Sequence, residues 1–324
     1  MQQGTERRPR VRWLRLAAKV FATTLVVVSL AYTVDFASLW SLLRSSKVSL
    51  LWVAVGITLL VNLIKPLRWL LLLRSVAPST SYKTALRSHL VSVGARLLLP
   101  GKVGEFGRAV GLPNVELKTG LYLAGLDVLL EVLITSAIAI PGLYLLFGWL
   151  GALALALPWA VLVVSVLRQS ARSSTVAEPA SSPTRFAWLK KLKSALHAAA
   201  RGIRVVGQLR LLTGLWMTLG IAGLRLLQLA TLVVSLGGAV NLTFAALYPV
   251  IQLADAIPLT VGGIGVREWV GVQVLPMGNI SVEAAAAAIF LQYLITNLLP
   301  GLVGWVVLLK VSDEHSINRP SWLR

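Results

Sequence analysis

The chain has 324 residues, of which 56% are apolar and 13% are charged, so polar residues are too few to cover a soluble globule and the composition predicts an integral membrane protein. It has no cysteine and three histidines that lie far apart in the sequence, which excludes disulfides and thiolate sites and leads us to expect no metal and no cofactor. The formal charge of +19 is interleaved with long apolar spans, which indicates contact with anionic lipid and not with nucleic acid.

The first predicted spans follow a basic N-terminus. Six basic residues within positions 1–19 precede an apolar run from Val20 to Tyr32, which predicts an uncleaved first span whose N-terminus is cytoplasmic. The second span runs from about residue 48 to 63 and continues to 73. It carries Arg68, which we interpret as an interface anchor or as a partner in a charge pair.

A broken segment, LLPGKVGEFGRAVG, follows at residues 98–111. Proline removes a backbone donor and glycine permits dihedrals that other residues avoid, so a continuous helix is not expected here. The residues that we expect to form a hairpin inside the membrane are Pro100, Gly101 and Gly104, with Glu105 and Arg108 beside the turn.

Two more predicted spans, 120–147 and 152–167, come next. The first carries Asp127 and Glu131 four residues apart, hence on one helical face, and we expect both to pair with cations across helices. Residues 168–210 are predicted to be cytoplasmic. They contain a Ser/Pro/Ala-rich linker and then, at 186–206, a basic amphipathic helix expected on an anionic lipid surface, although a plain connector is the alternative.

A second broken segment, IPLTVGGIGVREWVG, lies at residues 257–271, after a span at 211–236 that carries Arg225 near its middle. Its expected hairpin-forming residues are Pro258, Gly262, Gly263 and Gly265, and its charged neighbours are Asp255, Arg267 and Glu268. A last span is predicted at 282–309.

The predicted fold is an all-α membrane protein with one polytopic domain, 1–324, six spans and two re-entrant hairpins that enter from opposite sides, the first from the cytoplasm and the second from outside. Both termini then lie in the cytoplasm, and 27 of the 31 lysines and arginines fall in cytoplasmic or cytoplasm-proximal regions: 6 in residues 1–19, 9 in 65–118, 9 in 168–210 and 3 in 310–324. Residues 48–147 and 211–310 are interpreted as an inverted repeat, because proline, glycines, an acid and an arginine recur in both.

The two broken segments predict a site. Re-entrant backbone persists only when it is buried in protein or lines a watery cavity, and such a cavity suits a polar headgroup. The candidate headgroup residues are Glu105, Arg108, Arg225, Asp255, Arg267 and Glu268. Helix N-termini and arginines suit phosphate, while the acids either neutralise the arginines or bind a cation or a proton. The alternative is local ion pairing without any ligand, and no catalytic residue is expected.

LLPGKVGEFGRA and IPLTVGGIGVRE, each followed by a span, resemble the lysylphosphatidylglycerol synthase transmembrane-region family, also called the flippase-like domain family. The resemblance covers about residues 12–310 and implies a multi-pass inner-membrane protein that acts on lipids, with translocation between leaflets as the associated activity. The first family motif falls on Pro100, Gly104, Glu105 and Arg108, and the second on Pro258, Gly262, Gly263, Gly265, Arg267 and Glu268.

This sequence departs from the family pattern at one place. An Asp-Arg pair followed by an acid is common after the first hairpin, whereas here the place reads Asp127-Val128, with the acid at Glu131, so charge pairing on that helix must differ. The chain ends at Arg324 without the soluble synthase domain of the best understood members, so aminoacylation is not expected.

Three functions are compatible with these features. The first is a flippase for a phospholipid or polyprenyl-linked glycolipid headgroup, driven by a gradient because no nucleotide-binding loop occurs. The second is an intramembrane lipid-modifying enzyme, for which motif support is poor. The third is a non-transporting partner of a lipid or glycan synthase. The sequence does not contain the identity of the headgroup.

Overall fold

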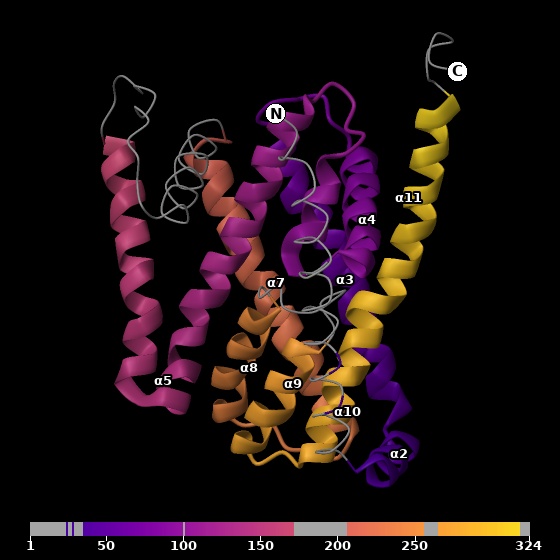
Figure 1. Ribbon diagram of the computed structural model, residues 1–324, viewed down its shortest axis with the longest axis vertical. Helices are drawn as coiled ribbons and strands as arrows, with labels where there is room; N and C mark the ends of the chain where they lie inside the picture. Colours follow the sequence, from indigo (N-terminus) through magenta and orange to yellow (C-terminus); the bar gives the residue numbers. More distant parts are fainter. Residues whose placement is uncertain are drawn as a thin grey trace, which may run out of the picture.

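The structure is a computed structural model that describes residues 24, 28, 35–99, 101–171, 206–255 and 265–317. Within these residues the chain is helical and contains no strand, which confirms the all-α prediction (Figure 1). Several sequence predictions fall outside the described residues: the first span apart from Thr24 and Val28, the linker from residue 172, the amphipathic helix before Val206, and Pro100, Pro258, Gly262 and Gly263.

Four described helical stretches are long and apolar enough to cross a membrane. They are α3 (Val48–Leu73), residues 117–157 of α5 (Leu117–Ala171), residues 209–235 of α7 (Gln208–Ser235), and residues 282–309, which span α10 (Val282–Tyr293), η4 (Leu294–Leu298) and most of α11 (Leu299–Ile317). The predicted spans 120–147 and 152–167 are the two arms of α5, because the chain reverses at Gly148, where φ is +64°. One boundary was wrong: α5 continues to Ala171, so the predicted linker begins as helix.

The first half of the chain contains a helical hairpin. Helix α4 (Tyr82–Leu98) begins at the upper end of Figure 1, where the Ser81 side chain accepts a hydrogen bond from the Thr84 N–H at 3.2 Å. The 3-10 helix η1 (Gly101–Ala109) then folds back along α4. Their contact requires glycine, because a Cβ on Gly104 would lie 2.5 Å from the Cα of Arg96.

The second half contains a hairpin that begins at the lower end of the same view. Helix α8 (Leu242–Ala254) rises from an Asn241 cap, and α9 (Val266–Val274) packs beside it and descends to η3 (Leu275–Gly278). Gly265 precedes α9 with φ of +113°, a conformation that favours glycine. Its N–H donates to the Glu268 carboxylate at 2.6 Å, which fixes the start of α9.

The first helix of each hairpin, α4 or α8, packs against a long helix from the other half of the chain. Helix α4 lies along α11, where a Cβ on Gly304 would come 2.2 Å from the carbonyl oxygen of Leu90. Helix α8 lies along α5, where a Cβ on Gly142 would come 2.3 Å from the carbonyl oxygen of Ala246. Because small residues allow backbones to approach closely inside a membrane, these two crossings tie the halves together. Helices α3 and α7 form a third contact.

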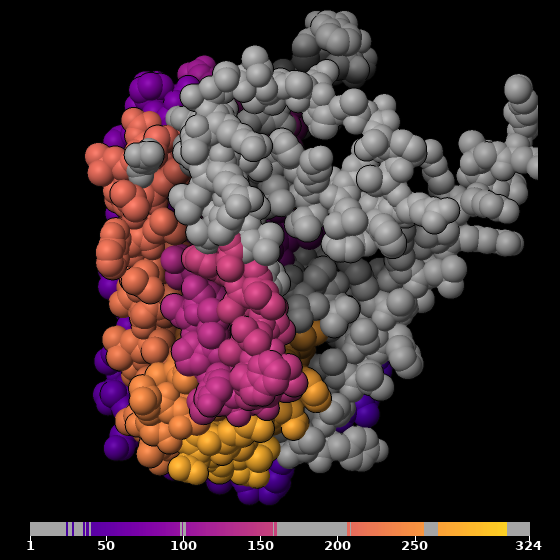
Figure 2. All heavy atoms as spheres, turned by 90° about the vertical axis from the view of Figure 1, so that its left-hand side faces the viewer, coloured from indigo at the N-terminus to yellow at the C-terminus, as the bar shows by residue number. Residues whose placement is uncertain are grey.

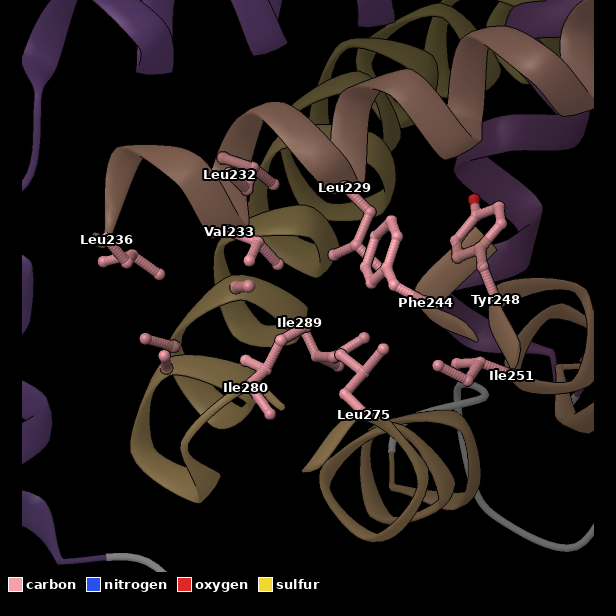
Figure 3. Close-up of a cluster of buried hydrophobic side chains, with 14 of the residues drawn as sticks. Leu229, Leu232, Val233, Leu236, Phe244, Tyr248, Ile251, Leu275, Ile280 and Ile289 are labelled. Carbon is pink, nitrogen blue, oxygen red and sulfur yellow. The ribbon is translucent and has the colours of Figure 1, made fainter. Parts of the chain in front are cut away.

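The lower half of the molecule is held by an apolar core between α7, α8, η3 and α10 (Figure 3). Its largest fully buried side chains include Phe244, Leu229, Leu232, Leu247, Ile251, Leu275 and Ile289. Helices α5 and α7 also carry exposed apolar side chains, among them Leu212, Trp216, Phe147 and Trp149. Figure 2 shows the face of the molecule on which these two helices lie. Such a surface suits lipid tails, whereas the charged side chains described below lie inside the helix bundle.

Candidate functional site

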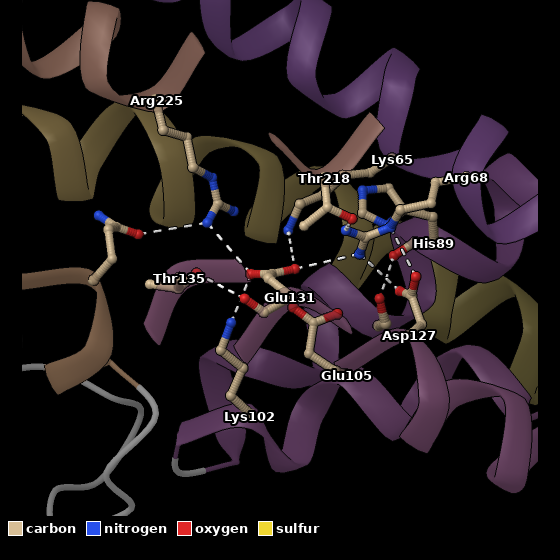
Figure 4. Close-up of polar contacts among 12 residues, drawn as sticks. Lys65, Arg68, His89, Lys102, Glu105, Asp127, Glu131, Thr135, Thr218 and Arg225 are labelled. Atoms are coloured by element: carbon tan, nitrogen blue, oxygen red, sulfur yellow. Dashed lines mark hydrogen bonds and ion pairs between the residues drawn. The ribbon is translucent and has the colours of Figure 1, made fainter. Parts of the chain in front are cut away.

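Nine charged side chains form one continuous set of ion pairs in the interior between α3, α4, η1, α5 and α7. Figure 4 shows the part of this set around Asp127 and Glu131. We call this set the charge network. It consists of Lys65, Arg68, Arg96, Lys102, Glu105, Arg108, Asp127, Glu131 and Arg225. Charged groups inside a membrane protein are costly unless they pair or face a polar space, and they mark functional sites by default.

Asp127 lies at the centre of one half of the network. Arg68 approaches it with two nitrogens, Nε at 2.7 Å from Oδ1 and Nη2 at 2.9 Å from Oδ2, and Arg108 pairs with the same carboxylate. Arg68 also donates to the Thr218 hydroxyl at 2.9 Å. The Arg68 side chain is only 1% exposed and pairs with both Asp127 and Glu131, so its contacts are those of a charge pair.

Glu131 lies one helical turn further along α5 and receives four cations. Their nitrogens come from α3, η1 and α7 and lie within 3.4 Å of the carboxylate: Lys102 at 2.6 Å, Arg68 at 3.3 Å, Lys65 at 3.4 Å and Arg225 at 3.4 Å. The spacing of four residues between Asp127 and Glu131 therefore places both acids on the face of α5 that meets these cations.

The motif pair Glu105 and Arg108 has both a local and a long-range role. Arg108 pairs with Glu105 three residues before it and donates from Nε to the Glu105 carbonyl at 3.0 Å. Arg96 binds the same carboxylate at 3.1 Å, and the Arg108 guanidinium lies 5.5 Å from the centre of the Trp69 ring. Local pairing, the alternative raised from the sequence, thus exists here, but it is one part of a larger network.

Arg225 connects the charge network to the second hairpin. Its Nη1 lies 3.4 Å from Glu131 and 3.5 Å from the side-chain oxygen of Gln252 on α8, while its buried Nε has no hydrogen-bond partner. Both contacts are longer than ordinary N–H···O bonds, which measure about 2.7–3.2 Å. The guanidinium is therefore placed between the two halves without being held firmly by either.

Of the charged residues of the second hairpin, Arg267 and Glu268 pair with each other, whereas Asp255 lines a cavity. Arg267 is 4% exposed and pairs with the neighbouring Glu268 at 3.2 Å, while its Nε has no partner. Glu268 also accepts the Gly265 N–H, so its first contacts are with its own helix start. Asp255, the C-cap residue of α8, lines a cavity together with Arg267 and Arg225.

Two small cavities meet at Arg225. The cavity beside Glu131 has a volume of about 20 Å³, and the cavity beside Arg267 has a volume of about 10 Å³. Arg225, Tyr248 and Gln252 line both, so the two cavities lie next to these polar side chains, one toward the charge network and one toward the second hairpin; we call the two cavities and the polar residues they share the polar track. A water molecule needs about 10–15 Å³ measured in this way, so each cavity has room for about one water and neither holds a headgroup in this conformation.

The sequence did not single out all members of the site. Lys65, Arg96 and Lys102 had been placed with the basic residues near the cytoplasm, yet all three bind carboxylates of the network. For Lys65 a signal existed: it precedes Arg68 by three residues, so both lie on one face of α3. Nothing in the sequence pairs Lys102 with Glu131, because that contact forms only when η1 lies against α5.

The acids of the site are bound by cations and do not form a metal centre. Within the described part of the chain no group of three or more histidine, aspartate and glutamate side chains is arranged to hold a metal ion. The arrangement suits reversible exchange of one anion for another on shared arginines and lysines, because several cations contact the same carboxylate.

Comparison with known families gives one match. Residues 16–304 match the model of the family described as lysylphosphatidylglycerol synthase TM region. No curated protein matched the chain. The matched range contains both hairpins, the charge network and both cavities.

Proposed function

Because the chain belongs to the lysylphosphatidylglycerol synthase transmembrane-region family, we propose that it is a lipid flippase that moves a polar headgroup between the leaflets of the cytoplasmic membrane. The headgroup belongs to a phospholipid or a polyprenyl-linked glycolipid. The observation that carries this proposal is the polar track, which joins buried charges of the first hairpin to those of the second through Arg225.

The packing of the two hairpins supports an inverted repeat of residues 48–147 and 211–310. Helix α4 enters from one end of the molecule and α8 from the other, and each lies against the last long helix of the opposite half. The two entering helices therefore make corresponding contacts, α4 with α11 and α8 with α5. In this proposal both hairpins are re-entrant, both termini are cytoplasmic, and the polar track lies near the middle of the bilayer.

In the proposed mechanism a headgroup crosses along the polar track while its tails stay in lipid. The cavities have room for about one water each, so the structure represents a closed state and the track must widen toward one leaflet at a time. Buried arginines and glutamates replace the water that the headgroup loses. Their cost inside the bilayer is offset by mutual pairing while the track is empty.

Lipid movement in liposomes tests the proposal. The purified protein is reconstituted with a lipid that carries a fluorophore on an acyl chain, and loss of the label from one leaflet is followed. We expect Arg267→Ala and Glu268→Gln each to abolish movement, because each removes one charge of the buried ion pair in the second hairpin. Arg210→Ala and Glu116→Gln change exposed residues of the same types and should leave movement unchanged.

Folded protein is verified by gel filtration in each case. Unchanged movement in both Arg267→Ala and Glu268→Gln would remove the second hairpin from the transport path. Covalent change of the lipid in the same vesicles would favour a lipid-modifying enzyme. Absence of both movement and covalent change would favour a partner protein of a synthase.

A further inference from the structure

We infer that Arg225, Arg96 and Arg267 form an anion site for a phosphate group at the wall shared by the two cavities, in the open conformation in which these cavities have widened. The inference rests on the proposed function and assigns the phosphate of the moved lipid to a place in the fold. Arg225 is the central ligand because it lines both cavities, and Arg96 and Arg267 line the cavity beside it.

The first argument is the balance of charge. The charge network joins six cations to three carboxylates, so it carries a formal excess of three positive charges. Adding the nearby Arg267, Asp255 and Glu268 leaves an excess of two. Uncompensated charge in a bilayer interior is costly, and a bound anion removes that cost directly.

The second argument is the unused hydrogen-bonding capacity of the arginines. A guanidinium has five N–H donors, yet Arg225 has only two long contacts, and its Nε is buried without a partner. The Nε of Arg267 is likewise buried and unpartnered. Among the described residues that line this cavity there are three arginines and one carboxylate, Asp255. The cavity therefore presents cationic donors in excess.

The third argument is chemical fit. Arginine binds phosphate through two parallel N–H···O bonds, a geometry that a lysine ammonium does not provide. Glu131 is the carboxylate that Arg225 already touches, so a phosphate entering from the cavity side competes with Glu131 for the same guanidinium. An anion arriving at the second hairpin thus loosens the link of Arg225 to the first hairpin.

A binding experiment tests the site without any assumption about transport. The purified full-length protein is titrated in detergent with inorganic phosphate and with glycerol 3-phosphate at constant ionic strength, and dissociation constants are read from thermal unfolding. We expect Arg225→Gln to weaken binding of both at least tenfold and Arg225→Lys to weaken it less. Arg210→Gln, an exposed change on the same helix, should have no effect.

The Arg225→Gln variant should still fold, because it removes one cation from a network in which cations outnumber carboxylates by three. If it does not, Arg96→Gln, whose side chain is 17% exposed, tests the same cavity and should also weaken binding at least tenfold. Failure of either phosphate compound to bind the wild-type protein, or equal binding by the wild-type protein and a folded Arg225→Gln, would overturn the inference.

A transport measurement distinguishes a lipid headgroup from a free anion as the ligand of this site. Liposomes contain labelled phosphatidylglycerol or a labelled neutral glycosyl diacylglycerol with the same acyl chains. Movement of phosphatidylglycerol at least tenfold faster, and its loss in Arg225→Gln, supports a lipid phosphate. Equal movement of both lipids overturns the inference and leaves translocation standing. Phosphate binding without movement of either lipid supports a site for free phosphate and contradicts a flippase for phospholipids.

Discussion

Glu131→Gln is the change that most directly tests whether the charge network holds the fold together. Glutamine keeps the length and shape of the side chain but removes its charge. Four cations lie within 3.4 Å of the Glu131 carboxylate, and its side chain is 8% exposed, so solvent does not replace what is lost. All four cations would then depend on the remaining acids of the network.

The expected cost is about 3–5 kcal/mol in the free energy of unfolding, which is the range for breaking a buried ion pair by removing one partner. A neutral amide oxygen recovers about 1 kcal/mol from one hydrogen bond, so the lower half of that range is expected. Removing the nearest cation as well, in Glu131→Gln with Lys102→Met, should cost less than the sum of the two single changes by about 1–3 kcal/mol.

Unfolding by sodium dodecyl sulfate in mixed micelles, followed by the fluorescence of the 11 tryptophans, measures this free energy. The exposed Glu116→Gln is the matched control and should change it by less than about 0.5 kcal/mol. A loss below about 1 kcal/mol for Glu131→Gln, or strict additivity in the double variant, would show that the network contributes little to stability.

Two further changes test the packing of the hairpins. Gly304→Val should destabilise the protein by more than about 2 kcal/mol in the same unfolding assay, because the new Cβ would meet the Leu90 carbonyl. Gly220→Ala is the control: a Cβ there would have no neighbour within 4 Å, so the change should be neutral or stabilising by up to about 1 kcal/mol. Gly265→Ala should cost about 1–3 kcal/mol in the free energy of unfolding, because φ is +113° at this position. It should also slow lipid movement, because the Gly265 N–H holds the Glu268 carboxylate. Lipid movement at the wild-type rate would contradict a role of this contact in transport.

The sequence predicted the membrane class and the helical character well, because both depend on composition and local pattern. Asp127 and Glu131 were placed on one helical face from their spacing alone, and the structure puts both in the interior. The partners of these two acids could not be predicted from the sequence. Arg68 lies 59 residues before Asp127, and only the packing of α3 against α5 brings the two together.

Cations were the harder residues to interpret. Lysines and arginines near apolar spans normally mark the cytoplasmic interface, so Lys65 and Lys102 were counted there. The structure buries Lys65 because α3 continues as helix through Pro66, which carries Lys65 inside the bundle. Lys102 reaches Glu131 because η1 is a tight 3-10 helix held against α4 at Gly104.

The sidedness of the two hairpins is the measurement that tests the account most directly. The chain contains no cysteine, so Val110→Cys, just after η1, and Met277→Cys, in η3, each introduce one exposed thiol at the base of a hairpin. In intact cells a membrane-impermeant maleimide should label Met277→Cys and should label Val110→Cys only after the membrane is opened. Labelling of both thiols from the same side would contradict hairpins that enter from opposite faces.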